Sequence, residues 1–487
     1  MTGGLLLALA TAPLAALIGC LVLRRPRICE ALNLIASAVS FACALPIPFL
    51  IDGRAILFWG DYVMIDRAAA WVVLCTSIVY LLASIYATGY MRLLNEDQRL
   101  FRFYALFAGF GLITLVAPLM NNISIYWIAI ELTTLVSTFL VAFEHVAESM
   151  EAAWKYIMLV SAGISLALLG TVVFYWGGSL VLGPSYQMTW AVLSEVAPKM
   201  NPVLLLLAFL LVLVGYGTKV GLAPMHSWLP DAHSESPAPV SAMLSGALLN
   251  TAMIGIGRFL GITQAADLGR LPQLALVAFG ALSLLVGALF IVRQEGIKRL
   301  MAYSSVEHMG VVALGFGFGG ALGVGGALYH MLNHSLNKSL MFFGAGNMMR
   351  AYGTKEILQI RGVSRFFPAQ GAVWLAGAIA ITGAPPFGLF LSEFTIMRAG
   401  LKPSFSWAVY VMAILLIVIF IGFMNHFRSM YYGPASVDTP PSRTACAWCA
   451  VPMWLAIAPL LVLGLWWPAG VWNYLTSIAH SLSPAVR

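Results

Sequence analysis

Charge is what this sequence lacks most. Only 9% of its 487 residues are Asp, Glu, Lys or Arg, whereas 61% are hydrophobic. A soluble domain usually carries about 25% charged residues. So few charged groups cannot cover the water-facing surface of a chain of this length, which excludes a soluble fold. We therefore expect an all-α polytopic membrane protein that forms one bundle rather than several soluble domains.

Cysteine and nucleotide-binding motifs are also scarce. Of the six cysteines, Cys446 and Cys449 form a lone C-x-x-C without a second pair, which we interpret as incidental. We find no Walker loop, no G-x-G-x-x-G after a strand and no basic patch interleaved with aromatic residues. The net charge of +7 comes mainly from short loops, as membrane topology requires. We expect no cofactor, no metal and no nucleic acid in this chain, so any electron transfer would take place in partner subunits.

Apolar runs long enough to span a bilayer, which needs ~20 residues, recur along the chain. About fourteen are expected, at 3–23, 28–50, 66–89, 103–120, 122–143, 153–176, 202–222, 238–262, 272–292, 300–319, 323–349, 370–390, 407–430 and 450–475. No positive region precedes the first run, so the N-terminus is expected to be a membrane helix and not a cleaved signal peptide. Residues 177–200 are expected to be the longest external connection.

Arginine and lysine are concentrated in the loops that follow odd-numbered spans. This positive-inside bias predicts that both termini lie on the non-cytoplasmic side of the membrane. We divide the chain into three N-terminal spans (1–100), a first half-channel (101–262), a second half-channel (263–430) and a C-terminal loop with the last span (431–487).

Two similar Gly/Pro segments interrupt apolar runs. Gly221-Leu222-Ala223-Pro224 ends the seventh span, and Gly383-Ala384-Pro385-Pro386 lies in the twelfth. The two segments are five spans apart, an odd number, so two five-helix units would insert with opposite orientation. The pattern predicts an inverted repeat with one broken helix in each half.

Ionisable residues inside the apolar runs are costly, at about 2.5–3.5 kcal/mol each. Glu131 lies in the fifth span and Lys155 at the start of the sixth, where the two could form a pair; a static ion pair is the structural alternative. Lys219 lies deep in the seventh span, just before the first break. A lysine desolvated by burial and balanced by a nearby carboxylate can exchange its proton when its partner moves. A lysine that snorkels to the interface is the alternative.

His330, His334 and Lys338 stand at i, i+4 and i+8, so they should project from one face of the eleventh span. Histidine both accepts and donates a proton near neutral pH, which predicts a relay. A zinc site is the rival interpretation, but no third ligand at a metal spacing is evident in the sequence. Glu393 follows the second break. Glu307 and His308, in Y-S-S-V-E-H, are accessory candidates with an interfacial or capping role as the alternative.

These residues suggest one row of alternating charge: Glu131, Lys155, Lys219, His334, Lys338 and Glu393. Protonation of one site in such a row changes the affinity of its neighbour for a proton. The segment K-V-G-L-A-P-M-H-S-W-L-P-D-A-H-S-E-S-P-A-P (219–239), which includes the accessory candidate His226, resembles the signature of the antiporter-like subunits of complex I and of multisubunit sodium/proton antiporters. So does R-L-M-A-Y-S-S-V (299–306). E-L-T-T-L-V-S (131–137) with E-S-M-E-A-A-W-K-Y (148–156) is most similar to component F of hydrogenase-4 complexes.

The resemblance implies a fourteen-helix core and proton translocation within a larger electron-transfer complex. By position, Glu131 and Lys219 match the family's key pair and Lys155 matches the lysine on the next helix. His334 and Lys338 match the linking groups, and Glu393 matches the terminal site. The eighth span departs from the pattern: where many relatives have lysine or histidine, this chain offers Ser245 and Asn250. Asparagine cannot carry a proton, so the central link would need water or another route.

Three functions are compatible with these residues. The first is a proton-translocating subunit of a membrane-bound oxidoreductase of the hydrogenase-4 or NADH–quinone type, with membrane and peripheral redox subunits as partners. The second is a subunit of a sodium/proton antiporter without redox partners. The third is a passive anchor whose buried charges only hold helices together.

Overall fold

The fold is a bundle of long helices with one small hairpin. The computed structural model describes residues 2–94, 99–266, 268–434 and 446–482. Its helices and strands are α1 (Thr2–Leu23), α2 (Pro26–Ala44), α3 (Ile47–Leu50), β1 (Ile56–Phe58), β2 (Val63–Ile65), α4 (Arg67–Tyr90), α5 (Leu100–Val116), α6 (Ile123–Val141), α7 (Ala147–Leu182), α8 (Trp190–Val196), α9 (Pro202–Val220), α10 (Trp228–Glu235), α11 (Ala238–Met243), α12 (Leu249–Ala265), α13 (Leu271–Val292), α14 (Ile297–Phe318), α15 (Gly320–Tyr352), α16 (Val363–Phe366), α17 (Pro368–Ile381), α18 (Gly388–Gly400), α19 (Ser406–Tyr432), α20 (Ala447–Leu465) and α21 (Ala469–Leu482).

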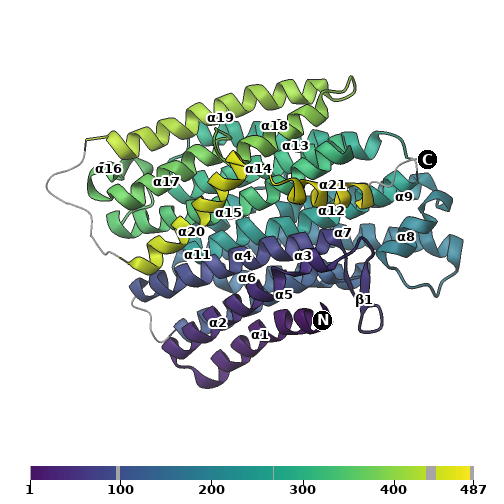
Figure 1. Cartoon of the computed structure of the whole chain (residues 1–487), viewed down its shortest axis with the longest axis horizontal. Coiled ribbons are helices and arrows are strands. Elements are labelled where there is room, and N and C mark those ends of the chain that lie inside the picture. The colour runs from purple at the N-terminus through teal and green to yellow at the C-terminus, as the bar shows by residue number, and fades with distance from the viewer. Residues whose placement is uncertain (1, 95–98, 267, 435–445, 483–487) are drawn as a thin grey trace.

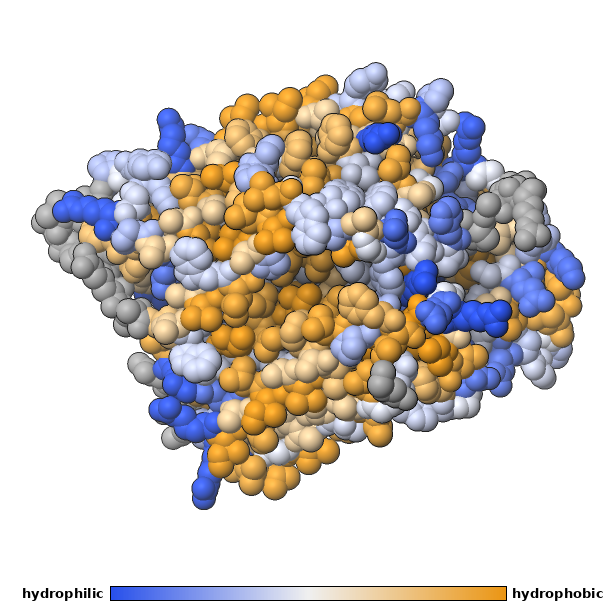
Figure 2. Space-filling view, viewed as in Figure 1, coloured by the Kyte–Doolittle hydropathy of each residue, from blue (hydrophilic) through white to orange (hydrophobic). Residues whose placement is uncertain are grey.

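The axes of the long helices lie roughly alongside one another, and the outer surface of the bundle is largely apolar. In Figure 1, α1 and α2 lie along one long edge and α19 along the opposite one, with α12, α14 and α15 between them. Figure 2 shows an apolar band across the middle of this face, with hydrophilic residues gathered toward its two ends. Such a band between polar ends fits a bilayer, because lipid tails solvate only apolar side chains. The predicted all-α membrane fold is confirmed.

Among the described residues, eleven helices are long and apolar enough to cross a membrane. The helices α14 and α15 are not among them, although they have 22 and 33 residues, because polar and charged side chains interrupt their apolar runs. Almost all of their residues are buried within the bundle. The apolar helices therefore surround the polar ones, which removes the cost of exposing charge to lipid. The total of fourteen spans stays a prediction.

Both predicted breaks are present. Helix α9 ends at Val220, and α10 begins only at Trp228. Helix α17 ends at Ile381, and α18 begins at Gly388. Gly221 and Gly383 adopt φ of +79° and +66°, which L side chains rarely adopt, so glycine is needed at both positions. Each break also contains one cis X-Pro bond. The inverted relation of the two halves, and the residue ranges assigned to them, stay predictions.

Several predicted boundaries were wrong. The expected external connection 177–200 is partly helical, because α7 extends to Leu182 and α8 follows at Trp190–Val196. The expected span 450–475 is divided between α20 and α21, with residues 466–468 between them. The antiparallel hairpin of β1 and β2 was not predicted, since its strands have only three residues each. The expected span 238–262 contains a π-helical turn, Leu244–Leu248, between α11 and α12. Such turns are frequent at functional sites.

Candidate functional site

Lys219 lies at the C-terminal end of α9, directly before the first break. Its side chain is fully buried. The ammonium donates hydrogen bonds to Thr134 Oγ1 at 2.8 Å and to the Tyr156 hydroxyl at 3.1 Å, and it lies 5.4 Å from the centre of the Tyr156 ring. The negative end of the α9 dipole favours a cation at this position. The snorkelling alternative is wrong, because the side chain points into the bundle.

Glu131 contacts Lys219 through one hydroxyl group. The Glu131 carboxylate, on α6, accepts hydrogen bonds from Ser161 Oγ at 2.6 Å and from Thr134 Oγ1 at 3.2 Å. Thr134 therefore donates its proton to Glu131 while it accepts one from Lys219. No ion pair joins Lys219 to a carboxylate within the described residues. A single side chain thus separates a buried cation from its nearest acid.

Lys155 does not form the pair with Glu131 that the sequence suggested. Its ammonium lies 2.6 Å from Glu151 and 3.3 Å from Asp231, and its side chain is 48% exposed. Residue 155 is only the ninth residue of the 36-residue helix α7, so it lies too near the helix end to reach the interior. Asp231 also pairs with Arg299 at 2.9 Å. Lys155 therefore belongs to a polar cluster at one end of the bundle.

His330, His334 and Lys338 all lie on α15 and are buried, as the spacing predicted. The Lys338 ammonium donates to the Met301 carbonyl at 3.0 Å and to Ser304 Oγ, both on α14. The ring of His334 lies 5.5 Å from that of His308, and neither of its nitrogens has a hydrogen-bond partner among the described residues.

The accessory pair Glu307 and His308 lies inside the bundle, so the interfacial alternative is wrong. Both are buried on α14. His308 Nδ1 lies 3.0 Å from His330 Nε2 and 3.9 Å from Glu393 Oε1. His308 Nε2 lies 3.4 Å from Glu307 Oε2. The helix α13 makes room for Glu307 at Gly287, where an added Cβ would approach the Glu307 Cβ to 2.7 Å. His308 is thus within reach of both carboxylates.

The second break positions Glu393. A Cβ at Gly383 would overlap the Glu393 carboxylate, so only glycine leaves this group its space. Glu393 Oε1 is buried without a hydrogen-bond partner among the described residues. The same carboxylate borders a cavity of about 530 Å³ between the break and α19, with Pro385, Phe390 and Ile417 in its walls.

The centre of the bundle holds amide and hydroxyl groups. Asn250 Nδ2, on α12, donates to Ser335 Oγ of α15 at 2.8 Å, so this residue braces two helices. Ser245 and Ser305 are hydrogen-bonded at 2.8 Å across α14 and the π-helical turn. His226, in the first break, is partly buried, with its ring 6.2 Å from that of Tyr303. Among these five side chains only His226 can carry a proton at neutral pH, because amides and hydroxyls do not ionise there.

Sequence reasoning missed several polar groups of the site. Thr134, Tyr156 and Ser161 contact the first-half pair, and Ser392 contacts His330 at 2.9 Å. Hydroxyl residues are common in membrane helices, so few signals mark these. Thr134 lies one turn after Glu131 and Ser392 lies directly before Glu393, whereas Ser161 has no acid or base within one turn of its helix. His233 of α10 is also buried, stacked on Phe342, and neither ring nitrogen has a partner among the described residues.

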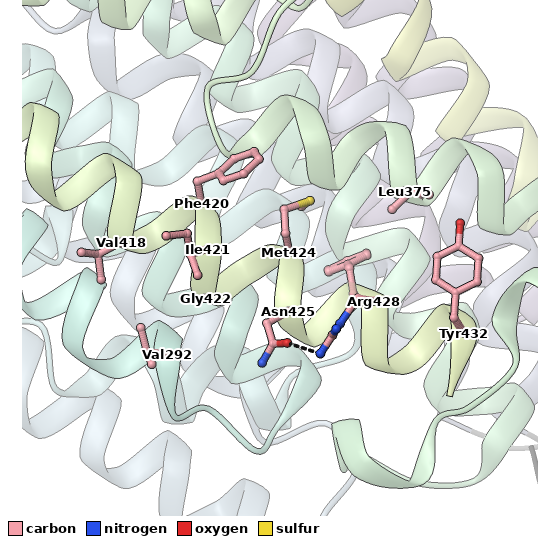
Figure 3. A pocket seen from close by; sticks show the side chains of 11 residues that line it. Val292, Leu375, Val418, Phe420, Ile421, Gly422, Met424, Asn425, Arg428 and Tyr432 are labelled. Atoms are coloured by element: carbon pink, nitrogen blue, oxygen red, sulfur yellow. Dashed lines mark hydrogen bonds between the residues drawn. The ribbon is translucent and has the colours of Figure 1, made fainter. Parts of the chain in front are cut away.

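The largest of the cavities described lies away from these groups. It measures about 720 Å³ and is lined by apolar residues of α13, α17 and α19, with Asn425 and Arg428 hydrogen-bonded at 3.0 Å near one end (Figure 3). Cys446 and Cys449 are free thiols packed beside Gly89. Neither feature touches the buried row. Of the described residues, only His308, His330 and Glu393 form a group whose ligand atoms could hold a metal.

Known proteins are similar to this chain in sequence and in architecture. Residues 120–422 match the family described as NADH:quinone oxidoreductase/Mrp antiporter, transmembrane. The chain is 37% identical over 388 residues to a hydrogenase-4 component F homologue of Methylacidiphilum infernorum, covering 78% of this chain and 80% of that protein. It is 30% identical to hydrogenase-4 component B of Escherichia coli, over 68% of this chain and 49% of that protein. A chain of the Mrp complex from Dietzia sp. DQ12-45-1b superposes with a TM-score of 0.87 at 19% identity, covering 99% of this chain and 98% of that one.

The matched region contains both helix breaks, the buried Lys219 and the imidazole-rich second half. An identity of 37% over 78% of this chain is more than two proteins with the same helix-bundle shape but unrelated sequences would share. This chain is an integral membrane protein of the NADH:quinone oxidoreductase/Mrp antiporter transmembrane family.

Proposed function

We propose that this chain translocates protons as a membrane subunit of a multisubunit oxidoreductase of the hydrogenase-4 type. The observation that carries the proposal is the state of Lys219. Among the described residues its buried ammonium hydrogen-bonds only to hydroxyl groups, and Thr134 alone separates it from Glu131. A charge stabilised this weakly is sensitive to its surroundings, because the low dielectric of the bundle strengthens every electrostatic change.

The geometry of the first half gives a mechanism. While Glu131 is ionised, its charge stabilises the Lys219 ammonium. When Glu131 takes up a proton or moves away, the ammonium loses that stabilisation and releases its proton. Tyr156 and Ser137, joined at 2.7 Å, can orient a water molecule beside Lys219. Lys155, with Glu151 and Asp231, lies at the end of the same half, where it influences proton entry rather than the central exchange.

In the second half the proton passes to a cluster that ends at Glu393. Lys338 and the histidines of α15 accept it, and His308 connects Glu307 with Glu393, since its ring has a nitrogen facing each. Between the halves, His233 and the hydrogen-bonded Ser245–Ser305 pair would provide the polar link, with His226 and Asn250 as accessory groups. Water molecules complete this link, because hydroxyl groups alone do not hold a proton.

The driving reaction comes from partner subunits. Two of the relatives named above are a hydrogenase-4 component F homologue and hydrogenase-4 component B, and the sequence has no cofactor motif of its own, so we infer redox partners that carry the electrons. The relation to hydrogenase components and the loop charges support a bacterial cytoplasmic membrane with both termini outside. Likeness to the Mrp complex supports a second candidate, a sodium/proton antiporter subunit. A complex I type NADH–quinone oxidoreductase subunit is the corresponding redox alternative.

Two measurements test the proposal. Gentle extraction of the tagged chain should co-purify a hydrogenase-like large subunit with iron–sulfur proteins; co-purification of small membrane proteins alone would favour the antiporter. In vesicles holding the complex, Lys219→Met should lower redox-driven proton uptake by about 10²-fold or more, the range typical of a lost proton-transfer group, while redox turnover by the partners remains. Proton uptake that depends on sodium instead would also favour the antiporter.

The passive-anchor function is tested by the same variant. An anchor predicts that Lys219→Met impairs assembly and leaves transport per assembled complex unchanged. Lys155→Met is the matched control, because this lysine belongs to the same half but is half-exposed. We expect it to retain most of the proton uptake. Equal losses in both variants would contradict the assignment of Lys219 as the central group.

A further inference from the structure

The second half contains three side chains that can ligate a metal as well as transfer protons. His308 of α14, His330 of α15 and Glu393 of α18 each direct one ligand atom to a common point, and these atoms lie within 4.8 Å of one another. Two of the separations are 3.0 Å and 3.9 Å. Tetrahedral zinc with bonds of about 2.0–2.1 Å places its ligand atoms about 3.4 Å apart. The three side chains therefore need only small shifts to enclose an ion.

The hydrogen bond between His330 and Ser392 sets the tautomer that a metal ligand needs. Ser392 Oγ donates its proton to the Leu389 carbonyl at 2.8 Å, so it can only accept from His330 Nδ1, which lies 2.9 Å away. The proton of His330 is then on Nδ1, and Nε2 presents a lone pair toward His308. A second hydrogen bond that fixes the ring and its tautomer is typical of histidine ligands to metals.

Glu307 would give His308 a similar partner once the ring proton is on Nε2, although no hydrogen bond joins the two groups in this structure. A metal at Nδ1 of His308 requires the ring proton to be on Nε2, and Glu307 Oε2 lies 3.4 Å from that atom. Both oxygens of Glu307 lack hydrogen-bond partners among the described residues. The result is a carboxylate–histidine–metal arrangement. Glu393 and Glu307 together also supply two negative charges, which balance a divalent cation inside an apolar bundle.

The site has an approach from outside the bundle. Glu393 borders the cavity of about 530 Å³ that lies between the second break and α19. Its orphaned oxygen Oε1 faces His308. Two neutral imidazoles and one carboxylate, with a fourth position left for water, form a ligand set that zinc commonly takes in open sites.

We propose that His308, His330 and Glu393 bind one Zn²⁺ ion, and that the bound ion blocks proton passage through the second half. Binding replaces the hydrogen bond between the two histidines and occupies the Glu393 oxygen that would take up the proton. Zinc binding stands independently of the proposed function, whereas the blockade rests on it. The sequence spacing suggested His330 and His334 of one helix as a zinc-binding pair. The structure instead brings together His308, His330 and Glu393 from three helices.

Direct metal binding is the test. The complex is purified in detergent, stripped with a chelator and titrated with Co²⁺, whose visible bands report nitrogen and oxygen ligation; Zn²⁺ displacement of Co²⁺ then gives the zinc affinity. We expect one high-affinity site in excess of those of the partner subunits. It should weaken by more than about 100-fold in His330→Gln and in Glu393→Gln. The milder Ser392→Ala should weaken it about 10-fold, as loss of a ligand's hydrogen-bond partner does.

His233→Gln is the matched control, since His233 is also buried with two orphaned nitrogens but lies on α10 and is not one of the three proposed ligands. Its Co²⁺ spectrum and zinc affinity should equal those of the unaltered chain. Unchanged affinity in His330→Gln and Glu393→Gln, or an equal loss in His233→Gln, would overturn the site. Zinc that binds as proposed but leaves proton uptake unaffected would overturn the blockade alone, and would not bear on whether Lys219 carries protons.

Discussion

The two halves of the bundle hold their buried charges by different chemistry. In the first half, the hydroxyls of Thr134, Tyr156 and Ser161 surround one lysine and one glutamate. In the second half, the His308 ring lies between Glu307 and Glu393, and Lys338 is buried on the same helix as His330 and His334. A hydroxyl group can only relay a proton between its neighbours, because it does not become charged near neutral pH. An imidazole can instead bind the proton itself. We therefore expect proton transfer in the first half to depend on one basic group, and proton transfer in the second half to be shared by several.

The largest difference between the halves is expected at the two breaks. Alanine at Gly383 meets a left-handed φ and overlaps the Glu393 carboxylate, while alanine at Gly221 overlaps only a terminal methyl of Leu229, which can rotate away. Backbone strain of about 1–2 kcal/mol and overpacking of about 1–3 kcal/mol should destabilise Gly383→Ala by about 2–5 kcal/mol. Thermal unfolding in detergent measures this loss.

Gly353→Ala separates backbone strain from overlap. Its φ is +66°, equal to that of Gly383, but no atom lies within 4 Å of an added Cβ. We expect a loss of about 1–2 kcal/mol from strain alone. If Gly383→Ala unfolds no earlier than Gly353→Ala, the close fit of the second break around Glu393 is refuted.

The next effect concerns the hydroxyl bridge of the first half. Thr134→Val keeps the shape of the side chain but removes the group that joins Glu131 to Lys219. Hydrogen bonds to charged groups contribute about 1.5–3 kcal/mol, so proton uptake should fall roughly 10-fold or more. Thr134→Ser should restore most of it. The measurement is redox-driven proton uptake in vesicles.

Thr138→Val is the control for that variant. Thr138 lies one turn further along α6 and donates only to the Thr134 carbonyl, at 2.8 Å. Its replacement removes a hydroxyl of equal size without touching Glu131 or Lys219. We expect nearly unchanged proton uptake. Similar losses in Thr134→Val and Thr138→Val would mean that general packing of α6, and not the bridge, limits the rate.

Sequence patterns predicted the parts of this comparison that depend on spacing along one helix. The i, i+4, i+8 spacing of His330, His334 and Lys338 required a common face, and Gly/Pro clusters required breaks. The position of Lys219 in a long apolar run, two residues before Gly221, placed it inside the bundle. These predictions succeeded because helix geometry and the cost of buried charge act locally, within one or two turns of the chain.

The remaining contacts depend on which helices become neighbours. Lys155 and Glu131 lie on consecutive helices. Lys155 is close to the N-terminal end of α7, however, and it contacts Asp231, 76 residues away along the chain. His308 meets both His330 and Glu393 only because α14, α15 and α18 pack together. Tertiary neighbours of this kind leave no periodic trace in a single sequence. The roles of these residues in proton transfer stay predictions until variants are measured.

A smaller effect is expected from His334. Its ring has no hydrogen-bond partner among the described residues, and His308 lies 5.5 Å away with His330 beyond it. Other imidazoles can thus take over the transfer, so His334→Gln should lower proton uptake only a few-fold, well below the ~100-fold loss expected for Lys219→Met. Parallel measurements in vesicles compare the two. Equal losses would show that the second half also depends on a single group.

The smallest effect on transport is expected at Asn250, where the sequence departs from relatives that have a lysine or histidine. Asn250 Nδ2 donates to Ser335 Oγ and to the Gly246 carbonyl, so it braces α12 against α15 and the π-helical turn. Asn250→Ala should cost about 1 kcal/mol of stability, measured by thermal unfolding, and leave proton uptake within about twofold, since a bracing amide carries no proton. Asn250→Asp keeps the shape but adds an ionisable group at the junction of the halves. Asn250→Ala could instead stop proton uptake in a stable complex. That result would show that water molecules beside Asn250 form the proton link between the two halves, rather than His233 and the Ser245–Ser305 pair.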